Sequence, residues 1–275
     1  MGQHRDTTLI TSAITNDYVF DIKNTSSTSN VTIKDLTIDN TAYANVGAVG
    51  FYLEEMRSTD ISNVNINNFE NGMILNNRNF FCVFSTLRFL NCFDTVTLSG
   101  DDASHKPNQN NFNDCLFNNN YGKIFQIEMG NNNTISACSF ENWAVVALEI
   151  QDGNANQIKG CRFECNSIGV PPTNGYVALG VLSQQNLVQD AYFTDGGASW
   201  VDFETSVVDL GGGNCIDCLN SYKDQRVLWK KNQAGAGDFV ELVRTGTGDL
   251  KSILTLSDEY ANSGDPIQLS LKSMR

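Results

Sequence analysis

Positive charge, proline and histidine are scarce in this sequence of 275 residues, and no long apolar run occurs. Lys and Arg number 18 against 31 Asp and Glu, so the formal net charge is −13. Because proteins bind nucleic acids largely through Lys and Arg side chains that displace counterions, we expect no nucleic-acid partner. Without a stretch of about 18 apolar residues, we expect no membrane insertion. Residues 1–8 are polar and no apolar core follows them, so we expect no secretory signal either.

The low proline content and the lack of helical periodicity indicate the fold class. Only 4 Pro, with 22 Gly and many Asn, lie among short β-branched and aromatic runs, which is typical of an all-β protein with tight Asn-rich turns. The two histidines, His4 and His105, argue against a Ser-His-Asp catalytic set, and no phosphate-binding loop or dinucleotide motif occurs. The Cys215-x-x-Cys218 pair has no second such pair, so we expect no metal site and no cofactor.

A repeated triplet of apolar residues organises the chain. Each triplet has residues at relative positions 0, +3 and +5, and positions below are counted from its first residue. The triplets are Ile33/Leu36/Ile38, Ile61/Val64/Ile66, Phe84/Leu87/Phe89, Phe112/Cys115/Phe117, Ile135/Cys138/Phe140, Ile158/Cys161/Phe163 and Val188/Ala191/Phe193, with a weaker eighth at Ile216/Leu219/Ser221. They recur about every 26 residues, a period that fits one coil of a solenoid.

Each unit carries a second run of alternating apolar residues, which predicts further strands with one face turned inward. These runs include Val49/Phe51/Leu53, Phe125/Ile127, Val146/Leu148/Ile150, Val177/Leu179/Val181 and Val208/Leu210. Two or three short strands per unit predict a parallel β-solenoid of about eight coils. The apolar columns are then core stacks. Asn columns at position +7 (Asn40, Asn68, Asn91, Asn119, Asn142) and position −2 (Asn110, Asn133, Asn156, Asn186, Asn214) are expected to satisfy backbone groups at turns.

Three cysteines share one column of the repeat. Cys115, Cys138 and Cys161 lie 23 residues apart, so we expect them to point inward as small apolar residues. Reduced thiols without a signal peptide fit folding in a reducing cytosol. After about residue 222 the coil pattern stops and short alternating runs continue. We therefore divide the chain into a lead-in segment with the first coil (1–30), a β-helix (31–222) and a β-rich cap or oligomerisation region (223–275).

The chain resembles the right-handed parallel β-helix of the pectate-lyase superfamily, in the form found in bacteriophage tailspikes and pre-neck appendage proteins. The resemblance covers roughly residues 7–222. It is carried by Asp6-Thr7-Thr8-Leu9-Ile10, Val19-Phe20-Asp21-Ile22, the run from Asn30 to Asp39 and the later I-x-x-C-x-F-x-N units. Members of this superfamily usually begin with a further acidic, Gly-rich segment and a capping helix. This chain starts almost at the Thr-Thr-Leu-Ile element, so we expect it to be truncated at its N-terminus.

The resemblance implies a right-handed, single-stranded β-helix, a homotrimer and a place on the virion tail or appendage after assembly in the host cytoplasm. It also implies a host surface polysaccharide as partner. Pectate lyases of the superfamily use calcium-binding Asp residues with an Arg or Lys base. No dense Asp cluster of that kind occurs here, so a calcium-dependent lyase is not expected.

Two outward columns of the first strand provide the candidate catalytic site. Position +6 contains Glu141 and Glu164 on neighbouring coils, where two carboxylates about 5 Å apart would repel each other, so that one holds its proton. Glycoside hydrolysis needs this division between an acid and a base or nucleophile. The sequence leaves a retaining and an inverting mechanism open.

Substrate-binding candidates surround this pair. Arg162, Tyr192, Trp143 and Arg88 could supply guanidinium groups and aromatic faces for sugars. Equally, the face could be an ordinary solvated one in which Arg162 neutralises both glutamates. Secondary candidates are Glu128, Glu149 and Asp152, near the end of the later strand.

The sequence therefore predicts a tailspike-like depolymerase that binds and cleaves a host surface glycan, by hydrolysis. The alternatives are a non-catalytic receptor-binding fibre or a structural β-helix shaft, and, less favoured, a polysaccharide lyase.

Overall fold

The computed structural model describes residues 8–24, 30–42, 47–143, 145–164, 176–194, 207–220, 226–232 and 243–244. The chain divides into two compact units, Met1–Thr245 and Gly246–Arg275, and every described residue lies in the first. Most of the predicted C-terminal region, 223–275, is thus outside the described residues. Within the described ranges no helix is long and apolar enough to cross a membrane.

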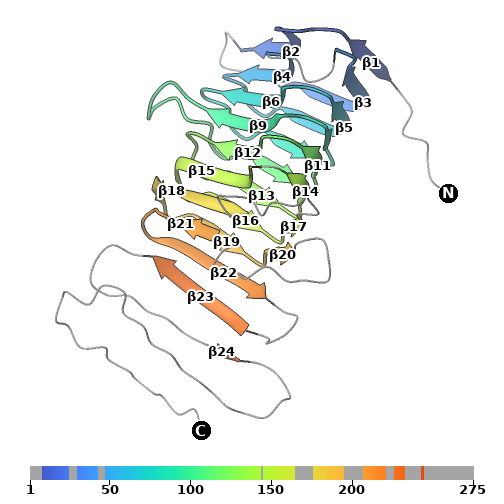
Figure 1. The fold of residues 1–275 in the computed structure, drawn as a ribbon. Coiled ribbons are helices and arrows are strands. Elements are labelled where there is room, and N and C mark those ends of the chain that lie inside the picture. Colours follow the sequence, from blue (N-terminus) through green and yellow to red (C-terminus); the bar gives the residue numbers. More distant parts are fainter. Residues whose placement is uncertain are drawn as a thin grey trace. The chain divides into compact units, whose positions relative to one another are not determined.

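Eight parallel strands form one sheet of a solenoid, which we call face 1 (Figure 1). In chain order they are β2 (Tyr18–Lys23), β4 (Val49–Glu54), β6 (Asn71–Asn76), β9 (Asp94–Ser99), β12 (Lys123–Ile127), β15 (Val146–Asn154), β18 (Val177–Gln184) and β21 (Val207–Asp209). Each strand between β2 and β21 pairs with the strand one coil earlier and one coil later. For example, Phe125 lies opposite Val96 on β9 and Leu148 on β15.

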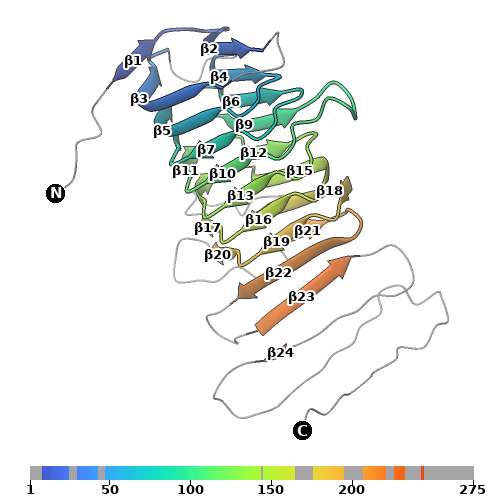
Figure 2. The same cartoon turned by 180° about the vertical axis from the view of Figure 1, so that it is seen from behind.

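The second sheet divides into two faces at β5 (Asp60–Asn67), which pairs with both β7 and β8. Face 2 contains β7 (Val83–Ser85), β10 (Asn111–Asn113), β13 (Thr134–Ser136), β16 (Gln157–Lys159), β19 (Leu187–Gln189) and β22 (Asn214–Asn220), visible in Figure 2. Face 3 contains β1 (Leu9–Ser12), β3 (Thr32–Asn40), β8 (Arg88–Leu90), β11 (Leu116–Asn120), β14 (Ser139–Trp143), β17 (Arg162–Glu164) and β20 (Tyr192–Thr194). One coil therefore runs from face 2 through face 3 to face 1, as in β10, β11 and β12. The predicted parallel β-helix is confirmed.

Single residues in the left-handed region turn the chain at each corner of the coil. At position +2, between faces 2 and 3, Asp114 has φ 54° and Ala137 has φ 52°. At position +7, between faces 3 and 1, the predicted Asn column provides this conformation in Asn68, Asn91, Asn119 and Asn142. At position −3, before face 2, the residues are Ser58, Phe81, Gln109, Asn132, Ala155, Gln185 and Gly213. Asn tolerates this region better than most residues do, which explains its recurrence at one corner.

The triplet columns form the core, as predicted. Phe89, Phe117, Phe140, Phe163 and Phe193 make one continuous stack, with successive ring centroids 5.1, 4.7, 4.8 and 5.1 Å apart. The thiols of Cys115, Cys138 and Cys161 are buried, and each donates to a backbone carbonyl one coil earlier, at 3.6 to 3.7 Å. The Cys138 thiol and burial hold the pKa of Cys161 above its ordinary value, so this cysteine stays protonated. These cysteines act as small core residues.

Truncation of a ring in the middle of this stack should be costly. Phe140 is fully buried between Phe117 and Phe163, and we expect Phe140→Ala to lower the free energy of unfolding by about 3–5 kcal/mol. Guanidinium denaturation followed by circular dichroism measures this loss. Phe81→Ala is the control, since that ring is 59% exposed; its effect should stay within about 0.5 kcal/mol. A similar small loss in Phe140→Ala would contradict the stacked core.

Two predicted inward residues of face 1 point outward instead. Val181 is 70% exposed and Leu210 is 64% exposed. For Val181 the cause is a shift of register between β15 and β18, where Ile150 pairs with Leu179 but Asp152 pairs with Leu182. The extra residue in β18 leaves Val181 and Leu182 both exposed, and burial resumes at Ser183. On β21 the buried residue is Val207, one position before the predicted run.

The Asn column at position −2 forms a buried ladder. The side-chain oxygen of Asn133 accepts from the backbone N–H and the amide of Asn110, at 3.1 and 3.0 Å, and Asn156, Asn186 and Asn214 continue the pattern one coil at a time. Each amide nitrogen also donates to a carbonyl of the preceding turn, such as that of Gly130 from Asn156 at 2.9 Å. The ladder satisfies backbone groups at this corner, as predicted.

The parallel ladder of face 2 ends at β22. Two antiparallel strands follow it, β23 (Arg226–Asn232) against β22 and β24 (Val243–Arg244) against β23. An open solenoid edge offers unpaired backbone groups to other chains, and β23 covers this edge.

Candidate functional site

The predicted outward columns lie on face 3 in the expected register. Position +4 aligns Arg88, Leu116, Ser139, Arg162 and Tyr192 across β8, β11, β14, β17 and β20. Position +6 aligns Asn118, Glu141, Glu164 and Thr194 in the same way. Neighbouring strands bring Glu141 and Glu164 together, because register partners in a parallel sheet are about 4.8 Å apart. The backbone therefore provides a rigid base for the pair.

Arg162 lies between the two glutamates. Its Nη2 forms an ion pair with Glu164 Oε2, and its Nη1 lies 3.9 Å from Glu141 Oε1. Ser139 Oγ also donates to Glu141 Oε1, at 2.9 Å. Spacing alone predicts two mutually repelling carboxylates. In the structure a guanidinium attracts both of them, and it is half-exposed while the carboxylates are partly buried.

The other predicted binding residues lie at different distances from this pair. Tyr192 is the register partner of Arg162 and is partly exposed. Arg88 is exposed on the same column but three coils away, about 14 Å along the solenoid. The backbone of Trp143 pairs with Asn120 at the end of β14, and its side chain lies outside the described residues. Face 3 thus brings Tyr192 to the glutamates and does not bring Arg88 to them.

The secondary candidates belong to face 1. Glu149 pairs with Lys123 at 2.8 Å and accepts from Gln151 Nε2 at 3.1 Å. Asp152 pairs with Lys106 at 2.9 Å, and this lysine fixes the end of the long excursion between β9 and β10. Glu128 follows β12 and is exposed. Glu149 and Asp152 each form an ion pair with a lysine, and they lie on face 1, whereas Glu141 lies on face 3. They therefore do not form a pair of catalytic carboxylates with Glu141.

The excursion contains a Ser, a His and an Asp in contact. Asp102 Oδ1 accepts from Ser104 Oγ at 2.6 Å and lies 2.8 Å from His105 Nδ1, while Ser104 Oγ lies 3.1 Å from the same nitrogen. The hydrogen bonds from Ser104 and then His105 hold the pKa of Asp102 below its ordinary value. A catalytic triad uses both ring nitrogens, one for the hydroxyl and one for the carboxylate. These contacts use Nδ1 for both, so they stabilise a turn.

Comparison with solved structures finds weak similarity to two phage proteins. No protein-family model matches the sequence, and neither does any curated protein. ORF18 of Geobacillus virus E2 is 13% identical, with a TM-score of 0.46, over 84% of this chain and 52% of that one. Tailspike protein 3 of bacteriophage CBA120 is 9% identical, with a TM-score of 0.20, over 84% and 59%. The chain resembles phage proteins in structure, weakly in the case of the tailspike. It spans a little over half the length of each.

No group of three or more His, Cys, Asp or Glu side chains within the described ranges is placed to hold a metal ion.

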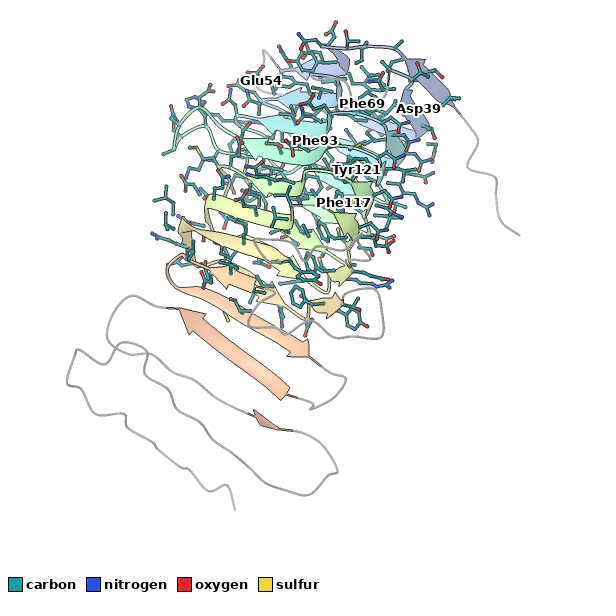
Figure 3. All side chains as sticks on the ribbon, in the orientation of Figure 1. Asp39, Glu54, Phe69, Phe93, Phe117 and Tyr121 are labelled. Carbon is teal, nitrogen blue, oxygen red and sulfur yellow. The ribbon has the colours of Figure 1, made fainter. Side chains whose placement is uncertain are left out.

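An exposed aromatic pair at the corner between faces 3 and 1 was missed by the sequence analysis. Phe93 and Tyr121 are each 45% exposed, and Figure 3 labels both at this corner. Both occupy position +9, counted from Phe84 and Phe112. Their shared position in the repeat is the sequence signal that marks them.

Proposed function

We propose that this chain is a phage tailspike-like protein that binds a host cell-surface polysaccharide and cleaves it by glycoside hydrolysis. The observation that carries the proposal is the position of Glu141 and Glu164 as register partners on neighbouring strands, with the half-exposed Arg162 in contact with both. Two carboxylates on a rigid face are the side chains that this reaction requires.

In this proposal one glutamate protonates the leaving glycosidic oxygen. The other either attacks the anomeric carbon or removes a proton from the attacking water. Arg162 positions both carboxylates and offers its exposed N–H groups to the sugar, and Tyr192 offers a ring on the adjacent strand. Trp143 and Arg88 remain proposed contacts for sugars farther along the chain. The anomeric configuration of the products decides between retention and inversion.

A receptor-binding fibre without catalysis is the second candidate. The contacts of Arg162 favour it, because a guanidinium that neutralises both carboxylates is also what a stable, inert face needs. In either case we propose a homotrimer on the virion tail or appendage, assembled in the host cytoplasm.

The first experiment incubates the purified chain with surface polysaccharides from candidate hosts. Polymer size and ultraviolet absorbance are followed together. We expect shortening without new absorbance, the signature of hydrolysis, whereas new absorbance would reveal the double bond left by a lyase. Binding without shortening would support the fibre, and neither binding nor shortening with any polysaccharide would overturn the proposal.

A further inference from the structure

Phe93 and Tyr121 are held rigidly at the corner between faces 3 and 1. Tyr121 N donates to the Cys92 carbonyl at 3.0 Å, and Gly122 N donates to the Phe93 carbonyl at 2.9 Å. Any side chain at residue 122 would collide with the Asp94 carboxylate and the Phe93 carbonyl. Lys123 N also donates to Asp94 Oδ1, at 2.9 Å. The backbone on both sides of the rings is therefore fixed before any ligand binds, which lowers the entropic cost of binding.

The amide ladder beside these rings is interrupted at the same place. Asn68 Nδ2 donates to Asp39 Oδ1 at 2.7 Å, and Asn91 Nδ2 donates to Asn68 Oδ1 at 3.3 Å. One coil beyond the gap, Asn142 Nδ2 donates to Asn119 Oδ1 at 3.1 Å. Among the residues that the structure describes, no hydrogen bond joins the side chains of Asn91 and Asn119. Asn91 is half-buried and Asn119 is exposed, so the acceptor of Asn91 and the donor of Asn119 that a continuous ladder would join are not bonded to each other, next to the two rings.

We propose that Phe93 and Tyr121, with the amides of Asn91 and Asn119, form a subsite for an uncharged sugar unit. The apolar face of the sugar ring stacks on the aromatic pair, and a sugar hydroxyl donates to the Asn91 amide oxygen and accepts from the Asn119 amide nitrogen. This inference rests on the proposed function. Tyr121 follows β11, and Glu141 on the next coil is the register partner of Asn118, three residues before Tyr121. The glycan then runs along the solenoid, across neighbouring coils.

The size and charge of this surface favour a sugar over a protein partner. The two rings and the neighbouring exposed Leu90 offer on the order of 300 Å², whereas a stable protein interface needs about 800 Å² per partner. Lys123, the cation that follows the pair, is bound to Glu149 at 2.8 Å. With a net charge of −13 and this lysine engaged, an uncharged sugar fits better than an acidic one.

The test measures binding in an inactive background, Glu141→Gln with Glu164→Gln, so that the polysaccharide stays intact. The probe is size-fractionated polysaccharide prepared from candidate hosts, and affinity electrophoresis gives the dissociation constant. We expect Phe93→Ala and Tyr121→Ala each to weaken binding about tenfold, and Tyr121→Phe to restore most of it because the ring face is kept. Phe81→Ala, which removes an exposed ring elsewhere, should bind as the parent does.

Unchanged binding in Phe93→Ala and Tyr121→Ala, with a parent that does bind, would overturn this subsite and leave the proposed function standing. An unsubstituted chain that neither binds nor shortens any polysaccharide would overturn both. Light scattering on the same variants tests the alternative that the two rings form a protein–protein interface. A change of oligomeric state on loss of either ring would assign the pair to contact between copies and overturn the subsite. The thermal melting curves of these variants should match that of the parent, because about half of each of the two aromatic side chains lies outside the core.

Discussion

Replacing Glu141 or Glu164 by Gln is expected to slow polysaccharide cleavage by about 100- to 10,000-fold, the range for loss of an acid or base in proton transfer. Gln keeps the shape of Glu and can still accept one hydrogen bond from Arg162, but it cannot transfer a proton or form a glycosyl ester. Binding should therefore change much less than the rate. The rate of new reducing ends measures cleavage, and affinity electrophoresis of the same variants measures binding.

Asp114→Asn is the matched control. Asp114 is an exposed carboxylate at a corner of the coil, with φ 54°, a conformation that Asn adopts readily. This variant has the same change of charge and should cleave at the parent's rate. Equal activity in Glu141→Gln, Glu164→Gln and Asp114→Asn would remove the catalytic role of the pair. Loss of activity together with loss of binding would instead indicate that the glutamates position Arg162 for the sugar.

The core of the fold is predictable from sequence because its signal repeats. Phe117, Phe140 and Phe163 each occupy position +5, and the same stacking contact recurs from Phe89 to Phe193. The Asn column at position −2 is predictable for a related reason, since a buried corner amide must bond to its equivalents in the neighbouring coils. A repeated physical requirement leaves a repeated residue type.

The remaining corners leave no such signal. Ser58, Phe81 and Ala155 share a left-handed conformation at position −3, yet they share no side-chain chemistry. The cost of this conformation is only about 1–2 kcal/mol per residue, and the paired strands on both sides impose it. The extra residue in β18 also leaves no signal in the sequence. The run Val177/Leu179/Val181 has the apolar alternation of a regular strand, although β18 shifts its register against β15.

The candidate site was predictable in position but not in its contacts. Register follows from the period, so the alignment of Glu141 with Glu164 could be read from spacing alone. The sequence also offered the arrangement in which Arg162 neutralises both glutamates, but it could not decide for it, because Arg162 has several rotamers that reach solvent or either carboxylate. Phe93 and Tyr121 could not be predicted in this way, because only two coils carry an aromatic residue at position +9, and two occurrences do not establish a repeated position.

Removal of one amide from the buried Asn ladder should destabilise the β-helix strongly. Asn156 is fully buried; its Oδ1 accepts from Asn133 N at 2.9 Å, and its Nδ2 donates to the Gly130 carbonyl at 2.9 Å. Asn156→Ala leaves both backbone groups buried without these partners, at about 1–3 kcal/mol each. With the cavity included, we expect the free energy of unfolding to fall by about 3–5 kcal/mol. Denaturation monitored by circular dichroism measures it, and Asn113→Ala, at an exposed amide of face 2, should cost under about 0.5 kcal/mol.

Asn156→Asp separates the hydrogen bonds from the cavity, because Asp has nearly the same shape as Asn. It keeps the acceptor for Asn133, but places an oxygen against the Gly130 carbonyl and Asn186 Oδ1, where Asn156 donated at 2.9 and 3.0 Å. Burial among acceptors should raise the pKa of this carboxyl above the unfolded value of about 3.9. Relative to the parent, the variant is then most stable below about pH 4, where the protonated acid still donates, and it loses stability as the pH rises toward the raised pKa. A cost independent of pH, and no larger than that of Asn113→Ala, would show that the ladder contributes little to the stability of the coils.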